Sequence, residues 1–179
     1  MEPNHVLSFW FEEVDPKFWW IKDAAFDEKI RKRFALIHLA ATRGELYEWR
    51  DTADGRLAEI IVLDQFSRNM FRGTAQAFQS DPIALVLAQE AIRHKYDIEL
   101  PQDRRFFVYM PFMHSESRAI HEVAVKLFMQ GDTSSSLDFE KRHKAIIDRF
   151  GRYPHRNAIV GRKSTPEELE FLKEPGSSF

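Results

Sequence analysis

Residues 54–73 read DGRLAEIIVLDQFSRNMFRG, and this stretch indicates the fold class. The run Leu57–Leu63 is apolar almost all round a helix, which is typical of a helix at the centre of a helical protein. On a helical projection of about 100 degrees per residue, Asp64 and Arg68 continue the apolar line, at a spacing that lets them pair. A polar arc therefore replaces a stripe that points into the core, and three more polar residues lie beside it: Gln65, Asn69 and Arg72.

Start and stop signals on either side of this stretch predict further helices. Asp23 caps one helix and Gly44 ends it, while Ser80 and Ser115 are read as caps of two later helices. A capping box opens the last helix at Thr165. No strand pattern or linker interrupts the series, so we predict a single all-α domain over residues 1–179. Short connections favour antiparallel neighbours, which predicts stacked antiparallel helical hairpins.

Composition limits the functional classes. Of the 179 residues, 44% are hydrophobic and 30% are charged, as in an ordinary folded protein. A net charge of −2 argues against a protein that coats nucleic acid, because such a protein needs a broad excess of Lys and Arg. The lack of cysteine excludes thiolate metal sites and cysteine nucleophiles. We find no leader pattern and no long apolar window, so we expect a cytoplasmic protein without membrane association.

Polar side chains stand in apolar stripes of three more predicted helices, and for the first, Glu90 with His94 one turn on, a structural role is preferred. Glu116 lines up with apolar residues that follow it at helical spacing, and His143 falls in a second such series. Because a buried unpaired charge is costly, we expect these two residues to converge with Asp64 and Arg68 in one pocket. At its rim we expect Asn69, His114 and residues 155–157. The alternative is a set of separate ion pairs and helix caps that only stabilise the fold.

A basic segment without acidic residues runs from Arg149 to Lys163. Arg152 lies within it, and a helix is predicted to begin at His155, Arg156 and Asn157. Free N–H groups at the start of a helix favour an anion, so this segment predicts an anion site. A solvated basic face is the alternative interpretation.

The sequence lacks the familiar catalytic motifs. His121-Glu122 begins like a zinc-protease motif, but Val125 stands where the second histidine is needed. The glycines form neither a phosphate loop nor a dinucleotide fingerprint, and we predict no metal and no cofactor. Two functions remain. A binding module for a small anionic ligand or an acidic peptide end is preferred, and a hydrolase-like enzyme would use His114, Glu116 and His143 for acid–base catalysis.

Three long motifs occur in order along the chain: Asp64–Gly73, Met110–Glu116 and Arg149–Asn157. Together with Gly161-Arg162 and Ser164–Glu168, they resemble the bacterial family called domain of unknown function 924. The resemblance spans nearly the full chain and implies a tetratricopeptide-like α-α superhelix, while the family name implies no reaction. The motifs contain Asp64, Arg68 and Glu116, which the helical projections identify independently.

Overall fold

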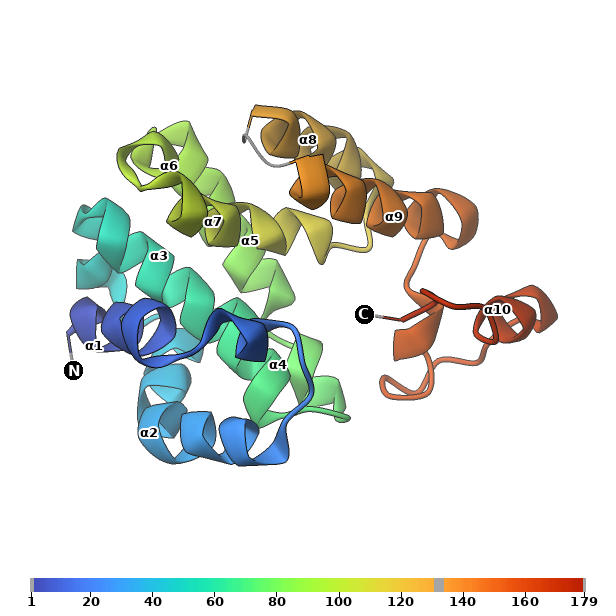
Figure 1. Cartoon of the computed structure of the whole chain (residues 1–179), viewed down its shortest axis with the longest axis horizontal. Helices are drawn as coiled ribbons and strands as arrows, with labels where there is room; N and C mark the ends of the chain where they lie inside the picture. The colour runs from blue at the N-terminus through green and yellow to red at the C-terminus, as the bar shows by residue number, and fades with distance from the viewer. Residues whose placement is uncertain (1, 131–133, 179) are drawn as a thin grey trace. The chain divides into compact units, whose positions relative to one another are not determined.

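The computed structural model describes residues 2–130 and 134–178, which form helices and turns with no strand among them (Figure 1). The predicted all-α class is confirmed. The chain forms two compact units: unit 1 consists of Met1–Arg72 and Gln76–Pro111, and unit 2 consists of Gly73–Ala75 and Phe112–Phe179. The single domain over residues 1–179 stays a prediction. No helix in the described part of the chain is long and apolar enough to cross a membrane.

Unit 1 is built around the stretch quoted above. That stretch forms α3 (Ala53–Ile61), a π turn (Val62–Phe66) and α4 (Ser67–Met70). Around it pack α1 (Pro3–Ser8), α2 (Ala24–Thr42) and α5 (Asp81–Arg93). The unit also contains α6 (Tyr96–Glu99), most of α7 (Gln102–Met113), a π turn (Phe9–Glu13) and the 3-10 helices Pro16–Trp19 and Tyr47–Asp51.

Aromatic rings fill the core of unit 1. Phe9, Trp10 and Phe66 are fully buried, and the ring of Phe66 lies 4.8 Å from that of Phe34 and 5.6 Å from that of Trp10. Phe107 of α7 contacts Trp10 edge-on, with ring centroids 5.8 Å apart. Such edge-on and tilted pairs are the favoured geometries of packed aromatic rings, and they join α2, α7 and the two π turns.

The π turn changes the helical projection made from the sequence. A π turn accommodates an extra residue, so the side chains after it lie on a different face from that of a plain α-helix. Asp64 itself is buried within the turn, while Arg68, Asn69 and Arg72 follow it. The predicted central position of the stretch is confirmed, whereas its projection as one regular helix is wrong.

Unit 2 contains α8 (Arg118–Gln130), α9 (Ser134–Phe150), a 3-10 helix (Pro154–Arg156) and α10 (Pro166–Phe171). Helices α8 and α9 pack side by side (Figure 1). They run antiparallel, because Arg118 at the start of α8 donates to Ile147 O near the end of α9. Gly151 ends α9 with a left-handed φ of 70°, a conformation that glycine adopts without a steric penalty.

The predicted helix boundaries agree with the structure in some places and differ in others. Asp23 caps α2 through Phe26 N–H at 2.7 Å, and the capping box of Thr165 and Glu168 is present. Ser80 provides no side-chain cap, and α8 begins at Arg118 rather than at the predicted Ser115. Glu116 therefore precedes the helix instead of belonging to its apolar stripe.

The predicted helix at residues 155–157 is also different. The chain forms a single 3-10 turn there, and the N–H groups of Arg156 and Asn157 donate to Tyr153 O and Pro154 O. The predicted start of a regular helix there is therefore wrong, while an anion site in the basic segment stays a prediction.

Candidate functional site

In unit 1, Arg68 joins two carboxylates. Its guanidinium lies 3.0 Å from Asp64 Oδ1, and it makes two hydrogen bonds to Asp81, with distances of 2.9 and 3.0 Å. Gln65 donates its side-chain amide to Asp64 Oδ2 as well. The predicted pairing of Asp64 with Arg68 is confirmed. Asp81, which looked like a helix-start residue in the sequence, is a partner that the sequence analysis missed.

A second cluster in unit 1 forms around Asp27 of α2. Arg72 donates to both carboxylate oxygens of Asp27, at 2.6 and 2.8 Å, and Asn69 donates to Oδ1 at 2.8 Å. Asn69 was expected at the rim of the predicted pocket, and Arg72 was expected in the polar arc beside Asp64 and Arg68. The structure places both Asn69 and Arg72 on a carboxylate that holds α2 against α4.

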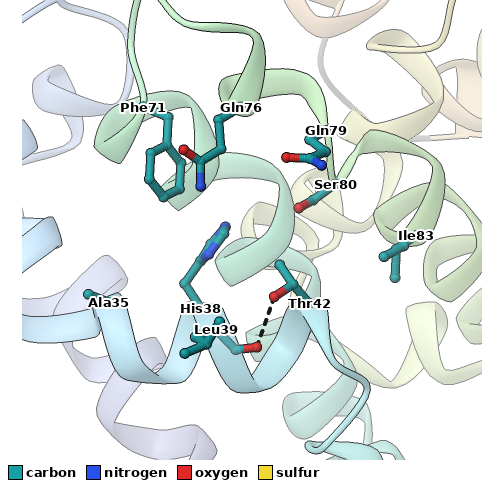
Figure 2. Close-up of a pocket in the computed structure, with 9 residues that line it drawn as sticks. All are labelled: Ala35, His38, Leu39, Thr42, Phe71, Gln76, Gln79, Ser80 and Ile83. Atoms are coloured by element: carbon teal, nitrogen blue, oxygen red, sulfur yellow. Dashed lines mark hydrogen bonds between the residues drawn. The ribbon is translucent and has the colours of Figure 1, made fainter.

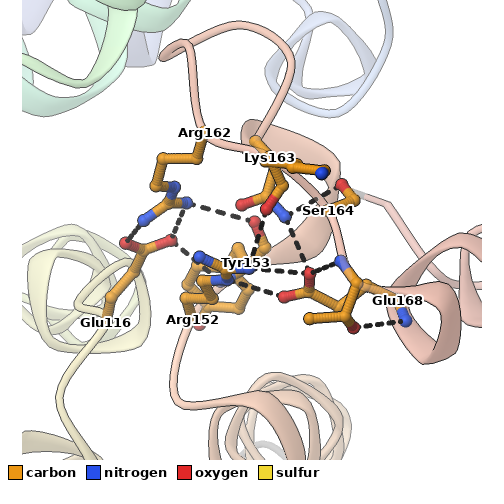
Figure 3. A network of polar contacts seen from close by, with 9 residues as sticks. Glu116, Arg152, Tyr153, Arg162, Lys163, Ser164 and Glu168 are labelled. Carbon is orange, nitrogen blue, oxygen red and sulfur yellow. Dashed lines mark hydrogen bonds and ion pairs between the residues drawn. The ribbon is translucent and has the colours of Figure 1, made fainter.

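In unit 2, the carboxylate of Glu168 receives hydrogen bonds from several donors (Figure 3). Arg152 donates twice, at 2.6 and 2.8 Å, Asn157 donates at 3.2 Å, and Thr165 N–H donates at 2.7 Å. The arginine hydrogen bonds are the main cause that lowers the pKa of Glu168 to about 2. Glu168 is therefore an ionised side chain that fixes the C-terminal loop.

Glu116 occupies a similar position on the other side of Tyr153 (Figure 3). Arg162 makes two hydrogen bonds to its carboxylate, and Tyr153 N–H donates to Oε1 at 2.8 Å. Burial alone raises the pKa of Glu116, but these hydrogen bonds outweigh it, and the pKa lies below its ordinary value. An ionised carboxylate with an arginine partner is better suited to holding the loop than to exchanging protons.

The ring of Tyr153 is the centre of a cluster of nitrogen-bearing side chains. Three imidazole rings contact it, with centroid distances of 6.3 Å for His121, 5.8 Å for His143 and 5.6 Å for His155. The guanidinium carbon of Arg156 lies 4.5 Å from the ring centroid, a cation–π geometry. The buried Tyr153 hydroxyl donates to Met113 O at 2.5 Å.

His121 and Glu140 form a fully buried pair between α8 and α9, with both side chains 0% exposed. Nε2 of His121 lies 2.9 Å from Ser115 O, which can only accept, so Nε2 carries a proton. Nδ1 lies 2.7 Å from Glu140 Oε1, and one proton is shared across that contact. Burial raises the pKa of Glu140, opposed by the hydrogen bond with His121, and so shifts the shared proton toward the carboxyl.

The second carboxylate oxygen of Glu140 has unusual surroundings. Its Oε2 is buried and has no hydrogen-bond partner within residues 2–130 and 134–178. Buried oxygens without a partner are rare and costly in folded proteins. Glu140 therefore differs from the other carboxylates of unit 2.

His143 is held in one tautomer. Its Nδ1 lies 2.8 Å from Phe139 O, so Nδ1 carries the proton of the neutral ring and Nε2 is an acceptor. Burial, together with the positive field of His114, His121 and Arg156, lowers the pKa of His143 to about 3. At neutral pH this ring is uncharged, in surroundings that disfavour an added positive charge.

The structure places the predicted site residues in both units. Asp64, Gln65, Arg68, Asn69 and Arg72 belong to unit 1, whereas His114, Glu116, His143, Arg152, His155, Arg156 and Asn157 belong to unit 2. Within unit 2, His143, His155 and Arg156 gather around Tyr153. The convergence of all of them in one pocket stays a prediction. Within the described residues, no group of three or more His, Cys, Asp or Glu is arranged to hold a metal ion.

Sequence reasoning missed the importance of His121, Glu140 and Tyr153. With α8 starting at Arg118, the buried residues of that helix include His121, Ala124 and Phe128, at helical spacing. The predicted stripe of Glu116 and Val123 was on the wrong face, since Val123 is exposed; a stripe through Ala124 and Phe128 would have identified the histidine.

Comparison with known proteins agrees with the sequence motifs. A family model described as "Bacterial protein of unknown function (DUF924)" matches residues 6–176. The chain belongs to the DUF924 family. A solved structure of a protein of unknown function from Agrobacterium tumefaciens is similar to this DUF924 member, with 42% sequence identity, a TM-score of 0.91 and 96% of each chain covered. A search of curated proteins finds no match.

Proposed function

We propose that this DUF924 protein is a binding module for a small anionic ligand, such as a carboxylate, a phosphate or an acidic peptide end. The ligand would bind beside Tyr153 in unit 2. The observation that carries the proposal is the gathering of His143, His155 and Arg156 around this ring. Arginine is a side-chain donor that proteins use to bind carboxylates and phosphates, and His143 would donate from Nε2 once an anion favours its protonation.

Electrostatics support the same position. His114, His121 and Arg156 all act on His143 in the direction that opposes its protonation. A bound anion would reverse this field and favour protonation of the imidazole, so ligand binding should raise the pKa of His143. Arg152 and Arg162 contribute less, because Glu168 and Glu116 already occupy their guanidinium groups.

A hydrolase-like enzyme is the second candidate, favoured by the His121–Glu140 pair. Catalytic histidines are commonly oriented by a carboxylate, and the raised pKa of Glu140 suits proton exchange better than the lowered pKa of Glu116. His121 and Glu140 are both 0% exposed, so they would support the acid–base group of His114 and His143 without touching the substrate.

The tetratricopeptide-like superhelix remains our proposal for the architecture, supported by the antiparallel packing of α8 and α9. Cytoplasmic residence remains the expectation from the cysteine-free sequence.

A thermal-shift titration with inorganic phosphate and with succinate tests the binding module, with sodium chloride as control at equal ionic strength. A ligand of the folded state raises the melting temperature in a saturable manner. We expect Arg156→Ala to abolish the shift and the exposed Arg142→Ala to leave it intact. An equal shift in both variants, or no shift with any anion in a broad set, would contradict the proposal. Turnover of a bound compound that Glu140→Gln abolishes, with binding retained, would favour the enzyme.

A further inference from the structure

Unit 1 contains a pocket of about 470 Å³ between α2 and the segment that leads into α5 (Figure 2). This volume lies within the range of about 300–1,000 Å³ that is typical of small-molecule sites. His38 and Leu39 line it from α2, and Phe71, Gln76, Gln79 and Ile83 line it from the opposite side. None of the lining residues is Asp, Glu, Lys or Arg.

The hydrogen bonds of His38 leave one ring nitrogen available. Its Nε2 lies 2.8 Å from Ser67 Oγ, and the Ser67 hydroxyl lies 2.6 Å from Leu63 O. Since the hydroxyl has one proton and the carbonyl can only accept, Ser67 donates to Leu63 O and accepts from His38 Nε2–H. Nδ1 of the neutral ring is therefore an acceptor. Within residues 2–130 and 134–178, no donor makes a hydrogen bond to it.

The same contacts argue against a serine nucleophile. Ser67 is 0% exposed, and its proton points to a backbone carbonyl instead of to the histidine. A serine nucleophile would have to donate to the imidazole and be reachable by a substrate. The pair is therefore suited to holding the His38 ring in place for binding.

Charge and shape define the ligand class. Burial lowers the pKa of His38, which is 6% exposed, so the ring is neutral at neutral pH. A charged ligand would lose its hydration without finding a counter-ion among the lining residues. The side-chain amides of Gln76 and Gln79 can donate and accept, while Leu39, Phe71 and Ile83 offer apolar contact.

We propose that this pocket binds a small neutral molecule with a hydrogen-bond donor, an alcohol or a primary carboxamide, on a short apolar body. The donor pairs with His38 Nδ1, and the apolar body lies against Leu39, Phe71 and Ile83. The site is separate from the anion site proposed in unit 2 and takes a different class of ligand.

Isothermal titration of the full-length protein with hexanamide tests the proposal, with hexanoate as the charged analogue of similar size. We expect saturable binding of hexanamide and at least about tenfold weaker binding of hexanoate. Equal affinity for the two probes, or no saturable binding of hexanamide, would overturn the proposal.

Variants identify the pocket as the place of binding. His38→Gln keeps a donor for Ser67 but replaces the fixed ring acceptor Nδ1 by an amide oxygen at a different position, and it should weaken hexanamide binding about tenfold. The matched control is His94→Gln, an exposed histidine of the same unit, which should change nothing. Because a buried variant can lose stability, the exposed Ile83→Arg provides a second test, and it should abolish binding by obstructing the pocket. Unchanged affinity in His38→Gln or in Ile83→Arg would contradict the assignment.

Discussion

Glu168 and Glu140 are two buried carboxylates of unit 2 with opposite surroundings. Glu168 in the C-terminal loop is 2% exposed and receives hydrogen bonds from Arg152, Asn157 and Thr165. Glu140 on α9 is 0% exposed and meets His121 alone among the described residues, with its second oxygen unpartnered. The pKa falls in the first case and rises in the second. The number of donors, more than burial, decides in which direction the pKa of each carboxylate moves.

The difference between Glu168 and Glu140 distinguishes a carboxylate that stabilises the fold from one that can still take part in proton exchange. A carboxylate that is surrounded by donors has no capacity left for a ligand, and it stabilises the loop that it joins. A carboxylate with one partner and a raised pKa keeps the ability to gain or lose a proton. Within unit 2, we therefore expect the protonation of the His121–Glu140 pair to respond most strongly to a bound ligand or to a change in pH.

The largest loss of stability is expected in unit 1. There, removing Arg68 tests the rule that a carboxylate with several donors stabilises the fold. Arg68→Met would leave Asp64 and Asp81 without their guanidinium partner and should cost about 3–5 kcal/mol in the free energy of unfolding. Urea denaturation followed by circular dichroism measures this change. The control is Arg93→Met, because Arg93 is 77% exposed and should contribute less than about 0.5 kcal/mol. Equal stability of the two variants would contradict the rule.

The next largest effect is expected when Glu168 and Glu140 are each replaced by the neutral glutamine. Glu168→Gln replaces an ionised acceptor among several donors and should cost about 2 kcal/mol at pH 7. Because the pKa of Glu140 is raised, this side chain loses less when it becomes neutral, and Glu140→Gln should cost less than about 1 kcal/mol. Glu167→Gln, on the exposed neighbour of Glu168, is the control and should be close to neutral. A greater loss in Glu140→Gln than in Glu168→Gln would reverse our assignment of the ionised group.

The smallest effect is a difference in the sign of a pH dependence. The pKa of Glu168 is lowered to about 2, so its stabilisation is present above about pH 4.5 and is lost as the pH falls toward 2. The pKa of Glu140 is raised, so its contribution is present below about pH 4.5 and is lost as the pH rises through the folded-state value. The cost of Glu168→Gln should therefore grow with pH, and that of Glu140→Gln should shrink, by no more than about 1 kcal/mol per pH unit. Urea titrations between pH 3 and pH 7 measure both slopes, and slopes of the same sign would refute the comparison.

Local signals allowed much of the helical fold to be predicted from the sequence. Asp23 and the Thr165 capping box act on backbone groups three residues away, so the sequence alone indicates the starts of α2 and α10. The π turn at Val62–Phe66 could not be predicted in this way, because a regular projection assumes a constant rotation per residue. The sequence predicts a start of α8 at Ser115, whereas the helix starts at Arg118, and the assignment of Glu116 to its apolar stripe depended on that early start.

The candidate site was harder to predict because its contacts join distant positions. The partner of Glu116 is Arg162, 46 residues away, and the partner of His121 is Glu140 on the next helix. Polar residues in apolar stripes correctly indicated that Asp64 and His143 are buried. They did not indicate which opposite charge each residue would meet, because tertiary packing alone brings those groups together.

The π turn in the central helix also limits where the length of the chain can change. Residues 62–66 contain one residue more than a plain α-helix would need along the same path. Deleting a single residue there would restore a regular helix and rotate everything after it by about 100 degrees, since an α-helix has 3.6 residues per turn. Arg68 would then turn away from Asp81, and Asn69 from Asp27, without any substitution in either pair. This segment should therefore tolerate the exchange of one side chain for another far better than the loss of one position.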